Sequence, residues 1–390
     1  MQTLIELYDE RPLENVLGVE MFHPERVVYI CPENVAGDKR IHRQFRDYYR
    51  ARGLEPELFF YKANVYDSQY VLNLLRRTVE QYPDCAMDIT GGTDAVLFAA
   101  GLLCAEREFP VFTYSRRRNK FYNIRNASFA ANLPCDVRFS VEDCFRMAGG
   151  SMRSGRVDNA ILSSYLEDFE PFFRIYLKHR RDWTKIITFL QRVSQTAPEA
   201  PVPLEVRGPY EVKGERAARI SAPEPALRDL EEIGFLRELR IVPGESVAFV
   251  FRDQQIRAWL RDVGSVLELY VYKACLDTGL FDDVRTSAVV DWEEEKRENA
   301  VSNELDVMCT QGVTPVFISC KTCDVKTEAL NELAVLRDRF GGQIARAAIV
   351  TAERGRTVMR NRAAELNIRV IDLNDLQAGR IAERLESMMK

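Results

Sequence analysis

The sequence predicts an α/β protein with a sheet at each end of the chain and a mainly helical connector between the two sheets. Residues 1–125 alternate short apolar runs with amphipathic stretches, residues 139–195 have a helical pattern, and strands and helices alternate again after residue 254. Strands that alternate with helices at this spacing favour a parallel, Rossmann-like sheet with helices on both faces.

The N-terminal sheet should carry a ligand at one of its edges. The apolar runs lie at residues 3–8, 26–31, 57–61, 85–89 and 111–114, the helices at 38–52, 68–82 and 93–106, and a β extension at 120–124. Ligands of parallel sheets bind at the carboxyl ends of the strands. We therefore expect the site among residues 9–15, 32–37 and 90–93.

The rest of the chain divides at a proline-rich segment, residues 196–221, which is the best linker candidate. We expect helices at 140–147, 159–195, 224–232 and 235–239 and a strand at 245–251, a pattern similar to a small winged helix. A long helix (254–279), a strand (284–290) and a solvated charged loop (291–299) should follow. A hairpin of residues 304–310 and 315–320, a helix (327–340), a strand (346–351), a helix (355–366), a strand (369–372) and a last helix complete the pattern.

The composition excludes several classes of protein. Apolar residues make up 46% and charged residues 29% of the 390 residues, a balance typical of globular chains. No apolar run approaches the roughly 20 residues that cross a bilayer, so we expect a cytoplasmic protein without membrane contact. The net charge of −5 requires that any nucleic-acid contact come from a local basic patch. Nine scattered Cys indicate reduced thiols, and three distant His argue against a His-built zinc site.

Four polar side chains of the predicted hairpin should converge. Glu304 and Asp306 are two residues apart on one strand, as are Ser319 and Lys321 on the next, so each pair shares a face. Carboxylates that meet beside a Lys fit a Mg²⁺ or Mn²⁺ site, whose bound water can become a nucleophile. A strand salt bridge is the alternative. Glu268 lies in an almost wholly apolar helical window and needs a partner, a metal or Lys321, unless it faces solvent.

Residues 255–376 resemble the PD-(D/E)xK nuclease core in the helix with Glu268, the ELDV strand, the ISCKT strand and the order of elements. The resemblance implies that Glu268 and Asp306 bind divalent metal and that Lys321 assists phosphodiester hydrolysis. Ser319 departs from the family pattern, because an acid is usual at its position. Glu304 would replace that carboxylate, and Glu365 is a weaker candidate.

A loop with two glycines, Thr90-Gly91-Gly92-Thr93, follows a predicted strand and opens a helix. Glycines allow close backbone approach and a helix N-terminus favours an anion, although an ordinary strand-to-helix turn has the same pattern. With this loop, residues 1–125 resemble the CARF domain, the CRISPR-associated Rossmann fold. The resemblance implies a homodimer that binds a cyclic oligoadenylate across its axis. The implied ligand-binding residues are Asp9, Glu10, Asn15, Thr90, Gly91, Gly92 and Thr93. Arg116, Arg117, Arg118 and Lys120 would hold phosphates, or form a solvated turn.

Together the two resemblances imply a CARF sensor (1–135), a helical or winged-helix-like connector (136–253) and a nuclease domain (254–390). The combination is similar to the ancillary nucleases of type III CRISPR antiviral systems that cyclic tetra-adenylate activates. It implies a homodimeric, Mg²⁺- or Mn²⁺-dependent endonuclease that cleaves DNA or RNA with little sequence preference under allosteric control. Glu268, Glu304 and Asp306 would hold the metal, and Lys321 would position water or offset charge.

Four alternatives stay open on the sequence. The spacing of Arg174 and His179 matches the HEPN ribonuclease motif, which would cleave RNA without metal. Cys320-x-x-Cys323 is compatible with a redox or zinc pair, although an inert core thiol is expected for Cys320. CARF domains also occur in transcription regulators. A regulator would not need the carboxylates and the Lys, which argues against this alternative. The fourth alternative is that the CARF domain itself degrades the cyclic oligoadenylate.

Overall fold

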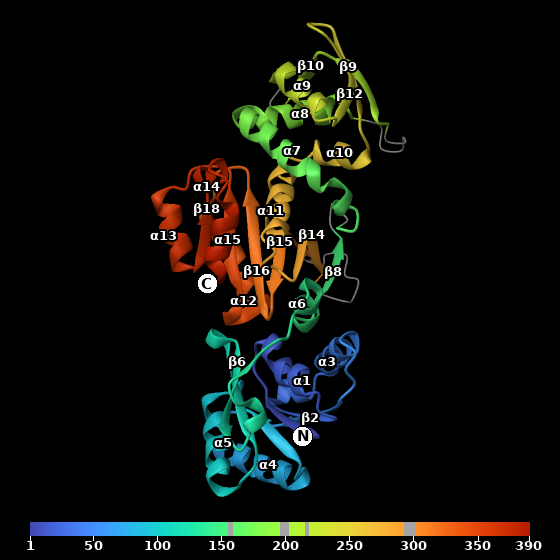
Figure 1. Cartoon of the computed structure of the whole chain (residues 1–390). Helices are drawn as coiled ribbons and strands as arrows, with labels where there is room; N and C mark the ends of the chain where they lie inside the picture. The colour runs from blue at the N-terminus through green and yellow to red at the C-terminus, as the bar shows by residue number, and fades with distance from the viewer. Residues whose placement is uncertain (155–158, 196–202, 215–217, 292–301) are drawn as a thin grey trace.

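The computed structural model describes residues 1–154, 159–195, 203–214, 218–291 and 302–390. Its main features are a seven-stranded sheet in the order β3-β2-β1-β4-β5-β6-β7 and a six-stranded sheet in the order β18-β17-β16-β15-β14-β8, with smaller sheets of three and two strands. Figure 1 shows the N-terminal sheet at one end of the molecule, the C-terminal sheet in the middle and the middle of the chain at the other end. The predicted α/β fold class, with a Rossmann-like N-terminal sheet, is confirmed.

The N-terminal sheet is parallel from β3 to β5 and antiparallel beyond. Its strands are β1 (Thr3–Leu7), β2 (Arg26–Cys31), β3 (Glu57–Lys62), β4 (Cys85–Asp88), β5 (Val111–Ser115), β6 (Lys120–Arg125) and β7 (Leu133–Pro134). Its helices are α1 (Leu17–Phe22), α2 (Glu33–Ala36), α3 (Lys39–Ala51), α4 (Ser68–Gln81) and α5 (Asp94–Glu106). Neighbouring strand residues serve opposite faces: Leu4 packs with α1 and α3, and Ile5 packs with α4 and α5. The sheet is therefore covered by helices on both faces.

The C-terminal sheet combines an antiparallel hairpin with two parallel strands. Its strands are β14 (Asp283–Asp291), β15 (Ser302–Gln311), β16 (Thr314–Lys321), β17 (Arg346–Thr351) and β18 (Ile368–Ile371). The helices of this unit are α11 (Ser265–Asp277), α12 (Thr327–Gly341), α13 (Thr357–Glu365), α14 (Leu373–Gln377) and α15 (Ile381–Met389), whereas α10 (Gln254–Trp259) lies with the middle of the chain (Figure 1). A further edge strand, β8 (Ser151–Ser154), follows α6 (Val141–Met147) and pairs with β14, so residues from the expected connector complete this sheet.

Three sequence predictions about helices are wrong. The expected helix over 159–195 is two helices, α7 (Leu166–His179) and α8 (Trp183–Val193), separated by a short turn at Arg180–Asp182. The expected helix over 254–279 is two helices, because the Asp262 carboxylate accepts bonds from the backbone N–H groups of Gly264 and Ser265 and starts α11 anew. The expected helix at 235–239 is part of strand β12 (Leu236–Val242), which pairs with β13 (Ser246–Phe251). The predicted charged loop at 291–299 lies outside the described residues apart from Asp291, which ends β14.

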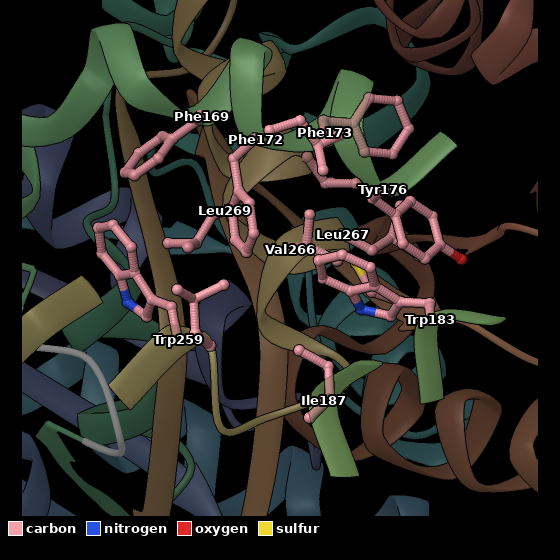
Figure 2. Packing of buried hydrophobic residues seen from close by; sticks show 14 of the residues in the cluster. Phe169, Phe172, Phe173, Tyr176, Trp183, Ile187, Trp259, Val266, Leu267 and Leu269 are labelled. Carbon is pink, nitrogen blue, oxygen red and sulfur yellow. The ribbon is translucent and has the colours of Figure 1, made fainter. Parts of the chain in front are cut away.

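The middle of the chain packs on α11 and lies away from the N-terminal sheet (Figure 1). Its elements are α7 (Leu166–His179), α8 (Trp183–Val193), α9 (Glu224–Glu232), β9 (Glu205–Pro209), β10 (Glu211–Lys213), β11 (Arg219–Ser221), β12 and β13. Figure 2 shows aromatic side chains of this unit, such as Phe172 and Trp183, against Val266 and Leu267 of α11. This unit lies between the two sheets in the sequence but not in space, because the C-terminal sheet separates it from the N-terminal sheet (Figure 1).

The two large sheets share one hydrophobic core. Phe340 at the end of α12 lies 4.9 Å from the Phe145 ring of α6 and 6.2 Å from the Phe317 ring of β16, measured between centroids. The same cluster contains Leu13 and Tyr48 of the N-terminal unit. No helix in the described part of the chain has the length and apolarity that a membrane span requires.

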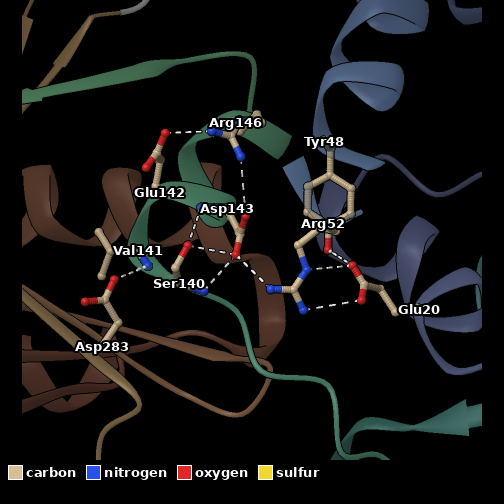
Figure 3. Close-up of polar contacts among 9 residues, drawn as sticks. All are labelled: Glu20, Tyr48, Arg52, Ser140, Val141, Glu142, Asp143, Arg146 and Asp283. Carbon is tan, nitrogen blue, oxygen red and sulfur yellow. Dashed lines mark hydrogen bonds and ion pairs between the residues drawn. The ribbon is translucent and has the colours of Figure 1, made fainter. Parts of the chain in front are cut away.

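A buried ion-pair network joins the N-terminal helices to α6 (Figure 3). Arg52 donates to Glu20 at 2.9 Å and to Asp143 at 3.4 Å, and the Tyr48 hydroxyl donates to the same Glu20 carboxylate at 2.7 Å. The side chains of Glu20 and Asp143 are only 8% and 6% exposed. The hydrogen bonds to Glu20 raise the pKa of Arg52, against the opposing effect of its burial.

We predict that Arg52→Met lowers the free energy of unfolding by about 1.5–3 kcal/mol, because it removes the cation from two buried carboxylates. Arg50→Met is the matched control on the same helix, since Arg50 is 72% exposed and pairs only at the surface with Asp47 at 3.7 Å; it should change stability by less than about 0.5 kcal/mol. Urea unfolding measures both. Equal effects of the two variants would contradict the role given to the network.

Candidate functional site

Asp306 is the centre of a set of hydrogen bonds within the β15–β16 hairpin. Its Oδ2 atom accepts the backbone N–H of Cys320 at 2.6 Å, the Ser319 hydroxyl at 3.1 Å and the Lys321 ammonium at 3.3 Å. None of these three bonds goes to Oδ1. The hairpin therefore holds the carboxylate in one orientation and leaves its other oxygen for a further ligand.

Lys321 is charged beside this carboxylate. Burial disfavours the ammonium form, but the Asp306 carboxylate outweighs burial and raises the pKa of Lys321. Its side chain is 36% exposed, so it can reach a bound molecule. Because Val316, Ile318 and Cys320 pack on the α11 side, Lys321 leaves the opposite face of β16, toward α12.

The strand alternation breaks next to Asp306. Leu305 packs with α12 whereas Val307 packs with α11, although residues two apart on a regular strand share a face. Across the ladder, Ser287 of β14 has a left-handed backbone with φ 50°, and the Thr286 hydroxyl donates to the Asp306 carbonyl at 2.7 Å. The distortion lets Asp306 turn toward the pocket, which a pattern of apolar and polar residues could not predict.

A small pocket between β15, β16 and α12 collects most of the predicted residues. It is lined by Glu304, Asp306, Ser319 and Lys321 and, from α12, by Glu332, Leu333 and Leu336. Glu332 is an acid that the sequence reasoning missed, because its helix position looks like an ordinary exposed one. Glu365 is on α13, paired with Arg362 at 3.0 Å, and does not line this pocket.

Glu268 approaches from the other face of the sheet, where its Oε2 atom accepts the Ser287 hydroxyl at 3.5 Å. Its charge is one of the causes that raise the pKa of Lys321, so the two are electrostatic neighbours although Glu268 does not line the pocket. In the described part of the chain, no group of three or more His, Cys, Asp or Glu side chains stands close enough to hold a metal. Glu304 and Asp306 still supply two carboxylates to one pocket, a donor set that fits a Mg²⁺ ion with waters in its remaining positions.

The structure gives other roles to the residues of the HEPN-like motif and of the Cys320-x-x-Cys323 motif. His179 contacts Asp229 at 2.5 Å and Arg174 pairs with Glu170 at 2.5 Å, so the two side chains of the HEPN-like spacing have separate partners in the middle unit. Burial raises the pKa of the Cys320 thiol well above its ordinary value, which keeps it protonated and inert.

At the other end of the molecule, the loops after β1 and β4 touch. Gly91 permits this approach, since a Cβ atom there would lie 2.3 Å from the Leu7 carbonyl oxygen and 2.9 Å from the Asp9 Cβ. Asn15 is 2% exposed, accepts the Asp9 N–H at 2.7 Å and donates to the Asp9 carbonyl at 2.7 Å, so its amide shapes the first loop. Glu10 and Thr93 are exposed at the surface of the two loops.

Hydrogen bonds hold Thr90 and Thr93 in place. The Thr90 N–H donates to Asp88 Oδ1 at 2.7 Å and its hydroxyl donates to the same oxygen, while the Thr93 hydroxyl donates to the Val65 carbonyl at 2.7 Å. Asp88 and its neighbour Glu6 are fully buried beneath these loops, and the sequence analysis missed both as site residues. Their strand positions were the available signal, since acids are rarely buried in a parallel sheet.

The basic cluster lies beside the first loop. Arg116 begins a short turn (Arg116–Arg118) after β5 and forms an ion pair with Glu14, which is 2% exposed. Burial and the neighbouring Arg11 lower the pKa of Arg116. Arg117 and Arg118 are exposed and face solvent near the loops.

Comparisons with known proteins agree with this architecture. Residues 256–390 match the family model described as the Card1-like endonuclease domain. The fold matches protein VC1899 from Vibrio cholerae, with a TM-score of 0.77 and 18% identity over 98% of this chain and 97% of that chain. It also matches Can2 from Sulfobacillus thermosulfidooxidans, solved in complex with cyclic tetra-adenylate, with a TM-score of 0.73 and 16% identity over 100% and 99% of the two chains. Among curated proteins, none has a significantly similar sequence.

The resemblance to CARF nucleases is thus confirmed on two separate grounds. The fold similarity spans both sheets and the middle unit, and the family match covers the segment that contains Glu268, Asp306 and Lys321. The fold of the chain is similar to that of Can2 along its whole length, and residues 256–390 match the Card1-like endonuclease model.

Proposed function

We propose that this protein is a homodimeric, divalent-metal-dependent endonuclease that a cyclic oligoadenylate activates, with cyclic tetra-adenylate as the expected ring, in type III CRISPR antiviral defence. The observation that carries the proposal is the Asp306–Lys321 pair, held at 3.3 Å in a pocket of the segment that matches the endonuclease model. The activator is inferred from the fold shared with Can2, whose solved structure contains cyclic tetra-adenylate.

The pocket residues have separable roles in phosphodiester hydrolysis. Asp306 and Glu304 would hold Mg²⁺ or Mn²⁺, which when bound supplies an activated water and neutralises phosphate charge. Lys321 presents a permanent positive charge to the phosphate and orients the attacking water. Glu268, on the opposite side of the sheet, adds negative charge near Lys321 and would be the third acid to contribute to the metal site.

Ser319 changes the usual chemistry of such a pocket. Where an acid would add a third carboxylate, Ser319 donates a hydrogen bond to Asp306 at 3.1 Å. The pocket would therefore hold a cation with less negative charge and would depend more on the phosphate of the substrate to complete the coordination. No base-reading motif is evident in the sequence, so we propose cleavage of DNA or RNA with little sequence preference.

A surface beside the ligand loops supports the dimer. Helix α5 is apolar nearly all round, and its outward side exposes Phe98 (61%) and Leu102 (39%). Tyr66 (86% exposed) and Tyr70 (47% exposed) stand on the adjoining loop and α4. A second copy would cover these four side chains and bring two sets of loops together. A cyclic, two-fold ligand fits such an axis, with its phosphates near Arg117 and Arg118.

The contact between the ligand loop and α12 offers a route for activation. The Cγ and Cδ atoms of Arg11 lie 3.3 Å from the position of a Cβ on Gly342, directly after α12. The middle of α12, about 15 Å away along the helix axis, lines the nuclease pocket through Glu332 and Leu333. A ring that repositions the loop after β1 would shift α12 as a rigid element and reshape the pocket.

The first test is cleavage of labelled single- and double-stranded DNA and RNA with Mn²⁺ and cyclic tri-, tetra- or hexa-adenylate. We expect cleavage only with a ring and metal, and a loss of about 100-fold or more in Asp306→Asn and Lys321→Met, because each removes charge from the reaction centre. His179→Ala should retain full activity. Cleavage that persists in EDTA but disappears in His179→Ala would replace this proposal with a metal-independent ribonuclease.

The route through α12 has its own prediction. Arg11→Ala should lower the ratio of ring-stimulated to unstimulated cleavage by several-fold, which corresponds to about 1 kcal/mol of coupling free energy. Arg40→Ala is the control, since Arg40 is 91% exposed on α3 and pairs with Asp38 at 3.0 Å. Ring affinity is measured separately by calorimetry. An unchanged stimulation ratio in Arg11→Ala at saturating ring would exclude this contact from the route.

A further inference from the structure

Two carboxyl groups lie buried side by side beneath the ligand loops. Glu6 of β1 and Asp88 of β4 occupy paired positions in the parallel ladder, and both are fully buried. Glu6 Oε1 and Asp88 Oδ2 are buried atoms without a hydrogen-bond partner in the described part of the chain. Both face the same point, since a Cβ atom on Gly18 of α1 would lie 2.7 Å from the first and 2.9 Å from the second.

The groups packed around the pair do not neutralise it. Neither carboxyl forms an ion pair with a basic side chain of the described residues. Tyr29 of β2 and Tyr49 of α3 are neighbours of Glu6, and their hydroxyls share a hydrogen bond of 2.6 Å. Burial raises the pKa of both hydroxyls well above the ordinary range, so both are neutral. The Glu20–Arg52 ion pair on α1 and α3 is already satisfied at 2.9 Å.

Two anions cannot share such a site without a proton. Like charges at close range in a buried, weakly polar environment repel strongly, and a proton held between them converts repulsion into a charge-assisted hydrogen bond. Burial, and then Asp88, raise the pKa of Glu6 well above its ordinary range, and burial raises the pKa of Asp88 to about 7. The protonated form of the pair is therefore the one that the fold accepts.

Asp88 is also the support of the ligand loop. Its Oδ1 atom accepts both the N–H and the hydroxyl of Thr90, and the Thr90 hydroxyl oxygen accepts the Tyr114 N–H at 2.8 Å. The position of Thr90 to Thr93 thus depends on the orientation of one buried carboxyl. Gly18 contributes by leaving room, since any side chain there would press on both acids.

We infer that Glu6 and Asp88 form a proton-sharing carboxyl pair that positions the Thr90–Thr93 loop, and that they are positioning residues for the ring ligand. The inference rests on the proposed function for the identity of the ligand, but the pair itself does not. Loss of the shared proton leaves two buried anions, rotates Asp88 away from Glu6 and releases Thr90. Ring binding should therefore weaken as the pH rises.

The direction in which pH changes the stability of the fold follows from the raised pKa values of the two carboxyls. A carboxyl whose pKa is higher in the folded protein than in the unfolded chain stabilises the fold at low pH and loses that contribution as the pH rises through the folded value. For Asp88 this loss is complete once the pH has risen through its folded value of about 7, and the loss from Glu6, whose pKa is also raised, adds to it. One released proton permits at most about a tenfold loss of ring affinity per pH unit.

The test measures the affinity of the full chain for synthetic cyclic tetra-adenylate by calorimetry at pH 6, 7.5 and 9. We expect the wild-type affinity to fall at least tenfold across this range. Glu6→Gln and Asp88→Asn should bind as wild type does at pH 6 and keep that affinity at pH 9, because an amide donates the bridging hydrogen bond at every pH. Glu57→Gln, an exposed acid of the same sheet, should follow the wild type.

Thermal unfolding of the ligand-free chain separates this inference from the proposed function. The wild-type midpoint should fall between pH 6 and 9 by more than that of Glu6→Gln or Asp88→Asn. If the wild type binds no ring at any pH but shows this difference, the proposed ligand fails and the carboxyl pair stands. Parallel pH profiles for the wild type and both amide variants, or an amide variant that does not fold at pH 6, would overturn the pair.

Discussion

The convergence of three donors on one oxygen of Asp306 is the interaction on which the C-terminal site depends. A backbone N–H, a hydroxyl and an ammonium group from β16 all bond to Oδ2 of a β15 carboxylate. Two of the donors, Ser319 and Lys321, belong to side chains on the same face of β16. The pairing of β15 with β16 therefore also determines which charged groups the pocket contains. Lys321 remains protonated and stays within reach of any bound phosphate.

A shared core makes the two large sheets behave as one mechanical unit. Phe145, Phe317 and Phe340 belong to the same cluster as Leu13 beside the ligand loop, so a movement of that loop cannot be absorbed locally. Helix α12 joins the two regions, with Gly342 against Arg11 at one end and the pocket beside its middle. The middle unit packs on α11 at the far side, and its described residues do not contact this path.

The N-terminal sheet buries two acids beneath the Thr90–Thr93 loop. Buried acids without basic partners destabilise a fold when ionised, and Glu6 and Asp88 are two of them on adjoining strands. Asp88 receives both donors of Thr90, and Gly18 keeps the space between the acids clear. Activation by a ring and protonation of this pair would then be linked through the same loop.

The sequence by itself determined the order of elements in both sheets, because apolar runs of period two and helical stripes depend on local spacing. It also predicted that Asp306, Ser319 and Lys321 lie near one another on the hairpin, but the turn of Asp306 into the pocket depends on the distortion beside Ser287, which only the tertiary structure shows. Tertiary structure alone decided the split of α10 from α11 at Asp262, the strand β12 and the capture of β8 by the C-terminal sheet. It also placed Glu268 on the opposite face, brought Glu332 into the pocket and buried Glu6 beside Asp88. These features arise from contacts between residues far apart in the chain, where local pattern carries no information about which partner a side chain will meet.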